Sequence, residues 1–125
     1  MGRIITSVLI TNNGKEIRCD CLVDTGASSL ILPSAWKDRL GDFSSTSKVR
    51  LETADQRIIE GEACGPVKIQ IEGFRAIYNE CIFMDMEPKD GGYEPILGYI
   101  ILEQSQATVD MIGHRLIKVS YLDLK

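Results

Sequence analysis

The sequence predicts an all-β fold, namely a closed or nearly closed β barrel with one short helix near the C-terminus. Two observations lead to this prediction. Short apolar or alternating runs recur along the chain, and Gly, Asn, Asp and Pro, which favour turns, separate them. The stretch with the strongest helical character, 99–104, is short. A chain of 125 residues suits one domain, so we expect a single domain over 1–125.

The first third of the chain is interpreted as a hairpin, a short strand and a helix or turn. Residues 3–11 and 16–23 are predicted strands because Asn12-Asn13-Gly14-Lys15 between them is a strong turn signal. The fully apolar run 30–32 predicts a short strand. Residues 33–40 then predict a short helix or turn, which Gly41 ends.

The rest of the chain continues as strands separated by turns. We expect a polar loop over 41–47, a hairpin of 48–53 with 57–62, and two longer strands at 64–71 and 74–86. A loop over 87–95, a short strand at 96–98 and a helix at 99–104 should follow. The chain should end in a hairpin of 107–111 with 115–122. Gly65-Pro66 suggests a kink or a sheet edge in the strand 64–71, because Pro cannot donate a ladder hydrogen bond.

Charge and hydrophobic content argue against several classes of partner. The net charge is −4, both signs are mixed along the chain and no basic stripe is present, so we expect no nucleic-acid partner. No stretch approaches the roughly 20 apolar residues of a membrane span, so we expect no membrane partner. The first six residues lack the small-residue cleavage site of a signal peptide, which favours a cytoplasmic location.

Four cysteines leave two interpretations open. Cys19 and Cys21 are two positions apart on a predicted strand and therefore share a face, whereas Cys64 and Cys81 lie on other strands. Reduced, buried thiols are the first interpretation. A zinc site with four cysteine ligands is the second, although the C-x₂-C spacing of structural zinc sites is absent. We predict no metal and no other cofactor.

One acidic residue is placed as a catalytic group would be. Asp24 follows the apolar run 21–23 and begins Asp24-Thr25-Gly26, where Gly allows a tight turn before the next apolar strand. Later in the chain, another apolar strand ends at Gly98 and leads into the predicted helix. An Asp can simply bond its own turn, but the flanking strands favour a catalytic role. Because the motif occurs once, one chain carries half of a carboxylate pair.

Together these segments resemble the retropepsin-like aspartic proteases, the single-domain group that includes retroviral proteases and cellular relatives. The resemblance rests on Asp24-Thr25-Gly26-Ala27-Ser28, on the hairpin around Ala54-Asp55-Gln56, and on the segments 96–104 and 107–111. It covers most of the chain, in the expected order and spacing. It implies a retropepsin-like closed barrel and a homodimeric aspartic endopeptidase that acts on polypeptides.

The resemblance also assigns roles to individual residues. It implies that Asp24 is the catalytic acid and meets its copy from a second chain across a two-fold axis. The loop around it is completed by Thr25, Gly26 and Ala27. The flap that covers the substrate is formed by Ala54, Asp55 and Gln56. The apolar strand that supports the loop from behind is Ile96, Leu97 and Gly98.

The implied chemistry needs the pair. Two carboxyls a few ångströms apart cannot both ionise cheaply, so they share one proton, as is established for aspartic proteases in general. The charged member activates water and the neutral member polarises the peptide carbonyl. An extended peptide would bind by strand addition. We expect four residues to form apolar pocket or flap positions: Ile31, Leu32, Ile58 and Ile96. Such positions would favour substrates with large apolar side chains around the scissile bond.

The chain departs from the family pattern at three positions. Ala27 lacks the hydroxyl that two-lobed pepsins usually carry after the Gly. Ser28 and Tyr99 replace the Asp and Arg whose ion pair braces retroviral dimers. We expect the N-terminal strand and the final hairpin to supply the dimer sheet. The alternative interpretation is a catalytically inactive module that forms the same dimer and binds peptides without cutting them.

Overall fold

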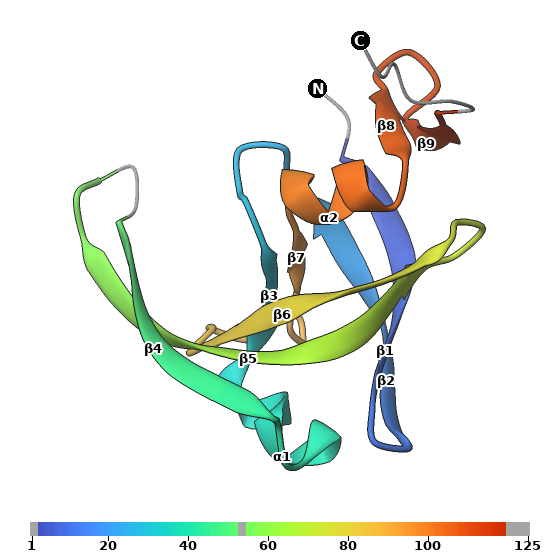
Figure 1. Cartoon of the computed structure of the whole chain (residues 1–125). Coiled ribbons are helices and arrows are strands. Elements are labelled where there is room, and N and C mark those ends of the chain that lie inside the picture. Colours follow the sequence, from blue (N-terminus) through green and yellow to red (C-terminus); the bar gives the residue numbers. More distant parts are fainter. Residues whose placement is uncertain (1–2, 53–54, 120–125) are drawn as a thin grey trace, which may run out of the picture.

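Strands make up most of the computed structural model, which describes residues 3–52 and 55–119 (Figure 1). The strands are β1 (Ile5–Asn12), β2 (Lys15–Val23), β3 (Leu30–Pro33), β4 (Ser45–Glu52), β5 (Ile58–Ile71), β6 (Ala76–Met84), β7 (Ile96–Leu97), β8 (Ala107–Asp110) and β9 (Arg115–Lys118). The helical segments are short: the 3₁₀ turn Ser34–Trp36, α1 (Lys37–Leu40) and α2 (Tyr99–Gln104).

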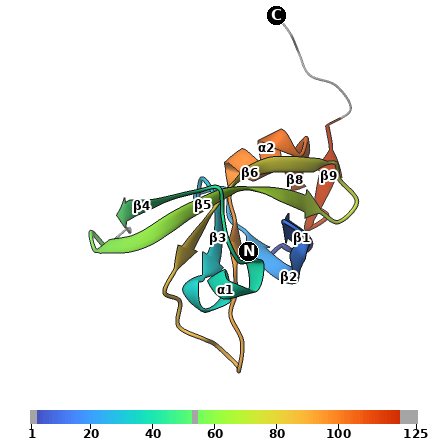
Figure 2. The ribbon, with the colours of Figure 1, turned by 60° about the horizontal axis from the view of Figure 1, so that its bottom comes forward.

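The main sheet closes on itself. Its strand order is β1-β2-β7-β3-β6-β5-β4, and β1 also pairs with β5, so the strands between them form a barrel-like ring (Figure 1). β4 pairs with β5 outside this ring, and both views show the β4–β5 hairpin projecting away from it (Figure 2). β8 and β9 form a separate two-stranded sheet. This arrangement confirms the predicted all-β, barrel-like fold.

The predicted turn between the first two strands has the backbone geometry that its sequence requires. Asn13 and Gly14 both have positive φ, 49° and 82°, and Asn12 pairs with Lys15 across the turn. Positive φ at both central residues defines the type I′ hairpin turn, which Asn-Gly adopts readily. The local sequence therefore fixes the register of β1 against β2.

Two segments differ from the sequence prediction in detail. Residues 57–62 and 64–71 were expected to be separate strands, but β5 runs through both because it stays paired with β6 on either side of a register shift between Cys64 and Val67. This bulge lies at the predicted Gly65-Pro66 irregularity. The predicted polar loop 41–47 is shorter than expected, because β4 already begins at Ser45. The helix or turn predicted over 33–40 is confirmed by the 3₁₀ turn and α1.

The core fills the ring with aliphatic side chains and cysteines. Its fully buried members include Val8, Ile10, Ile17, Leu30, Leu32, Ile69, Ile71 and Leu97. Cys21, Cys64 and Cys81 are buried and Cys19 is half-buried, and all four are free thiols. Within 3–52 and 55–119, no group of three or more His, Cys, Asp or Glu side chains is placed to hold a metal ion. No helix in those residues is long and apolar enough to cross a membrane.

A buried amide ties the end of β1 to the segment after α1. The Asn12 side chain is only 7% exposed, and its Nδ2 donates to the carbonyl oxygens of Leu40 and Asp42, both at 2.9 Å. Buried polar groups that lose their partners are costly, because water cannot replace the missing hydrogen bond. Asn12 therefore fixes α1 against the bottom of the ring.

We predict that Asn12→Ala lowers the free energy of unfolding by about 1–3 kcal/mol, because two carbonyl acceptors lose their donor. Urea unfolding monitored by circular dichroism measures this change. The matched control is Asn79→Ala, whose amide donates to Gln104 at the surface, where the expected change is within about 0.5 kcal/mol. Equal losses in the two variants would contradict the role given to Asn12.

Candidate active site

The loop that carries Asp24 connects β2 to β3, and β7 lies between these two strands and pairs with both. β7 pairs in parallel with the end of β2, with Leu22 opposite Ile96 and Val23 opposite Leu97. It also pairs antiparallel with the start of β3, where Leu30 lies opposite Leu97. Both ends of the loop 24–29 are therefore bonded to one two-residue strand.

Three backbone hydrogen bonds continue this attachment into the loop itself. The Asp24 amide donates to the Leu97 carbonyl at 3.0 Å. The amides of Tyr99 and Ile100, at the start of α2, donate to the carbonyls of Ala27 and Ser28 at 2.9 and 3.0 Å. The loop is thus held from β7 and from the first turn of α2.

Gly98 lies directly against this loop. A Cβ atom built on Gly98 would be 2.5 Å from the backbone carbon of Ser28 and 2.5 Å from the backbone nitrogen of Ser29. These are backbone atoms and cannot rotate away, so only glycine allows β7 and the loop to approach this closely. The predicted supporting residues Ile96, Leu97 and Gly98 all lie behind the loop.

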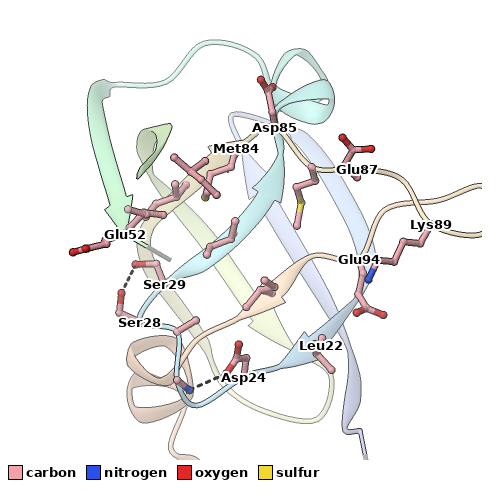
Figure 3. A pocket seen from close by; sticks show the side chains of 18 residues that line it. Leu22, Asp24, Ser28, Ser29, Glu52, Met84, Asp85, Glu87, Lys89 and Glu94 are labelled. Atoms are coloured by element: carbon pink, nitrogen blue, oxygen red, sulfur yellow. Dashed lines mark hydrogen bonds between the residues drawn. The ribbon is translucent and has the colours of Figure 1, made fainter. Parts of the chain in front are cut away.

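The Asp24 carboxylate is half-buried and is oriented by its own turn. Its Oδ1 accepts a hydrogen bond from the Gly26 amide at 2.9 Å, and the Ala27 amide donates to the Asp24 carbonyl at 3.1 Å (Figure 3). A Cβ on Gly26 would lie 3.2 Å from Oδ1. Thr25 is exposed at the tip of the turn. One carboxylate oxygen is thus fixed, and in the described part of the chain no hydrogen bond holds the other.

A cavity of about 750 Å³ opens in front of this carboxylate (Figure 3). Its apolar lining consists of Leu22, Ala27, Ile31, Leu51, Ile59, Ile82, Met84, Met86 and Ile96. Its polar lining, besides Asp24 and Gly26, consists of Ser28, Ser29, Glu52, Asp85, Glu87, Lys89 and Glu94. The cavity is large enough for a peptide segment or a drug-sized molecule.

The β4–β5 hairpin contributes one side of the cavity. Leu51 and Glu52 of β4 and Ile59 of β5 line it, on the strands that lead to the hairpin tip. Asp55 and Gln56 lie at the tip, where Gln56 has a positive φ of 65°. The third predicted flap residue, Ala54, lies outside the described residues.

Residues 7–100 match the family model described as aspartyl protease. The chain belongs to the aspartyl protease family. Among solved structures, EIAV protease complexed with the inhibitor HBY-793 is 26% identical with a TM-score of 0.65, over 88% of this chain and 94% of that one. The retroviral protease-like domain of Ddi1 from Leishmania major is 18% identical with a TM-score of 0.54, over 94% and 90% of the two chains. No curated protein sequence matches the chain.

These matches confirm the predicted retropepsin-like family and fold. The aspartyl protease model covers the Asp24 loop, the hairpin and β7, which are the segments on which the resemblance rested. It ends at residue 100, before most of α2 and before β8 and β9.

Of the four residues expected at apolar pocket or flap positions, two line the cavity, one lies on the hairpin and one lies in the core. Ile31 and Ile96 line the cavity. The expectation for Leu32 is wrong: it is fully buried in the core, because neighbouring strand residues point to opposite faces and Ile31 takes the cavity side. Ile58 is 62% exposed at the start of β5, on the hairpin rather than in the cavity.

Several residues that line this cavity were not expected from the sequence. Met84 is the last residue of β6, Asp85 and Met86 follow it, and Glu87, Lys89 and Glu94 lie in the loop 87–95. They reach the cavity because β6 pairs in parallel with β3, with Met84 opposite Pro33. No local pattern marks them, since a parallel pairing between distant segments leaves no signal in either one.

Negatively charged side chains outnumber positively charged ones around the cavity. Glu94 pairs with Arg3, and Asp85 accepts a hydrogen bond from Ser34. Among the described residues, Glu52 and Glu87 have no such partner, and Lys89 is the one cation in the described lining. The walls of the site are therefore apolar, and its polar rim has an excess of carboxylates.

We predict that Gly98→Ala destabilises the protein by about 1–3 kcal/mol, because the added methyl group must displace the backbone of Ser28 and Ser29. Urea unfolding measures the loss. Gly92→Ala is the matched control, since a Cβ there meets no atom within 4 Å. If both variants unfold at the same urea concentration, the close contact behind the Asp24 loop is not structurally required.

Proposed function

We propose that the protein is an aspartic endopeptidase that acts as a homodimer, with the Asp24 side chains of two subunits on either side of one water molecule. The observation that carries the proposal is a single Asp24 carboxylate, held by the Gly26 amide at the floor of a cavity. Membership of the aspartyl protease family supports the same reaction.

The second carboxylate is the reason for a dimer. Peptide hydrolysis by this chemistry needs one ionised carboxylate to take a proton from water and one protonated carboxyl to polarise the carbonyl. Within the described residues, no other carboxylate shares a hydrogen bond with Asp24. A two-fold axis beside the exposed Thr25 would supply the partner from an identical loop.

The cavity suits an extended peptide. β4 is the last strand of the sheet, and among the described residues only β5 pairs with it, so a substrate strand can add to its other edge through backbone hydrogen bonds. The lining from Ile31, Ile59, Ile82 and Ile96 offers aliphatic contacts for side chains near the scissile bond. We infer a preference for large apolar residues there, as the burial of such side chains is favourable.

We predict that Asp24→Asn abolishes peptide cleavage, because the amide can neither accept the proton from water nor share one with its partner. Mixing the variant with wild-type subunits tests the dimer at the same time. If subunits exchange freely and both Asp24 residues are needed, an equal mixture keeps about a quarter of the activity, since about a quarter of the dimers carry two carboxylates. Initial rates on an apolar peptide substrate measure this.

The control for this experiment is Asp20→Asn, which removes a carboxylate from the same strand outside the cavity and leaves the rate unchanged. Once native mass spectrometry has shown that mixed dimers form, a mixture that keeps about half of the activity would show that each subunit works alone and would contradict the shared pair of carboxylates. Wild-type protein that binds peptides without cleaving them would support the inactive peptide-binding module instead.

The carboxylate excess at the rim predicts a charge preference in the same reaction. We expect peptides with Lys or Arg a few residues from the scissile bond to be cleaved faster than neutral peptides. The double variant Glu52→Gln with Glu87→Gln should lower kcat/KM for the basic peptide roughly threefold to tenfold at low salt, because exposed ion pairs contribute modestly. Its effect on the neutral peptide should be small.

The matched control is Glu16→Gln with Glu72→Gln, which changes the net charge equally at exposed positions away from the cavity. The preference for basic peptides should weaken as salt is added, since salt screens exposed charges. Equal losses in both double variants would assign the effect to net charge and not to the rim.

A further inference from the structure

A pair of thiols lies on the strand that leads to Asp24. The Sγ atoms of Cys19 and Cys21 are 3.7 Å apart, on the same side of β2. Cys21 is fully buried, whereas Cys19 is half-buried and therefore keeps some exposure to solvent. Nothing in the proposed peptidase reaction uses either thiol.

The backbone allows these two sulfurs to approach further. Two residues along a strand span about 6.4–6.8 Å between Cα atoms, which is the upper end of the range that a disulfide bridges. Within residues 3–52 and 55–119, β2 is paired on one side only at this point: β1 pairs with both cysteines, whereas β7 pairs with Leu22 and Val23. The backbone at Cys19 and Cys21 can therefore bend on the side away from β1, which would bring the two sulfur atoms to bonding distance.

The two thiols differ in acidity in a complementary way. The pKa of Cys19 is lowered, chiefly because Cys21 donates a hydrogen bond to it, and the Arg39 cation adds to this against burial and the Asp20 charge. The pKa of Cys21 is raised well above its ordinary value by the same hydrogen bond and by burial. Cys19 is thus the nucleophile and Cys21 keeps its proton until the second step.

We propose that Cys19 and Cys21 form a redox-active dithiol, which small disulfides such as oxidised glutathione convert reversibly into a disulfide within strand β2. The Cys19 thiolate attacks one sulfur of oxidised glutathione, forming a mixed disulfide and releasing one glutathione thiolate. Cys21 then loses its proton to solvent and attacks Cys19 Sγ, which releases the second glutathione. The protein dithiol is oxidised by two electrons, and one glutathione disulfide becomes two thiols.

The other two cysteines provide an internal comparison. Cys64 and Cys81 lie opposite each other on β5 and β6, but both are fully buried. Burial raises the pKa of Cys81 to about 12 and also raises that of Cys64. A thiol that is neither ionised nor accessible reacts slowly with disulfides, so this second pair should stay reduced under the same treatment.

Closure of the bond would act on the Asp24 loop. Cys21 lies on β2, three residues before Asp24, and its backbone pairs with Thr6 of β1. A disulfide between Cys19 and Cys21 would shorten β2 between these residues, and the disulfide would therefore be strained. Strained disulfides are readily reduced. These properties suit a reversible modification rather than a structural crosslink.

The test is to incubate the folded full-length protein with oxidised glutathione, block remaining thiols with N-ethylmaleimide under denaturing conditions, and digest with trypsin. Cleavage after Arg18 and Lys37 leaves both cysteines on the fragment 19–37, whereas Cys64 and Cys81 fall on the fragments 58–68 and 76–89. We expect the fragment 19–37 to lose the mass of two hydrogens and to carry no label, and the other two fragments to be labelled. Dithiothreitol should restore labelling of the fragment 19–37.

Single variants identify the order of the steps. Cys21→Ser should keep one glutathione on Cys19, because the resolving thiol is missing, and Cys19→Ser should leave Cys21 free for the label. Double labelling of the wild-type fragment 19–37, or equal oxidation of Cys64 and Cys81, would overturn the proposal. The wild-type result stands without the variants and does not depend on peptidase activity.

Discussion

The insertion of β7 between β2 and β3 is the constraint on which the rest of the structure depends. A strand of two residues joins the end of one strand to the start of another, and its neighbour Gly98 lets α2 begin directly against the loop. Backbone hydrogen bonds provide all of this attachment, so it does not depend on which side chains line the cavity. The position of the Asp24 carboxylate is therefore a property of the backbone.

This division between backbone and side chains explains how the site is built. The loop that carries the acid is held by strand pairing, while most of the cavity wall comes from side chains of β3, β4, β5, β6 and the segment that follows β6, with Leu22 of β2 and Ile96 of β7 beside the loop. Walls of this kind can change without moving the acid. A scaffold that fixes the reactive group and leaves its surroundings variable can serve many substrates.

Local signals made most of the fold predictable from the sequence. Asn13-Gly14 set the first hairpin, the apolar run before Asp24 marked the end of β2, and Gly98 marked the end of β7 and the start of α2. These features act over a few residues. The apolar pocket was predicted less well, because assigning Leu32 to it required knowing which face of a fully apolar strand meets the core.

Features that depend on distant segments were not accessible in this way. The parallel pairing of β3 with β6 brings Met84 to Glu87 to the cavity, and the pairing of β1 with β5 closes the ring. No turn or sequence motif predicts either of these two strand pairings. The continuity of β5 through Ala63 was also missed, whereas the irregularity expected at Gly65-Pro66 corresponds to the bulge between Cys64 and Val67.

The unbroken course of β5 has a mechanical consequence. Its first half is one arm of the hairpin over the cavity, and its second half pairs with β1, which in turn pairs with the strand that ends at Asp24. A displacement of the hairpin is therefore transmitted along hydrogen-bonded strands that lead back to the loop that carries Asp24. The hairpin beside the cavity and the loop that carries Asp24 are thus linked mechanically through the sheet of this one chain.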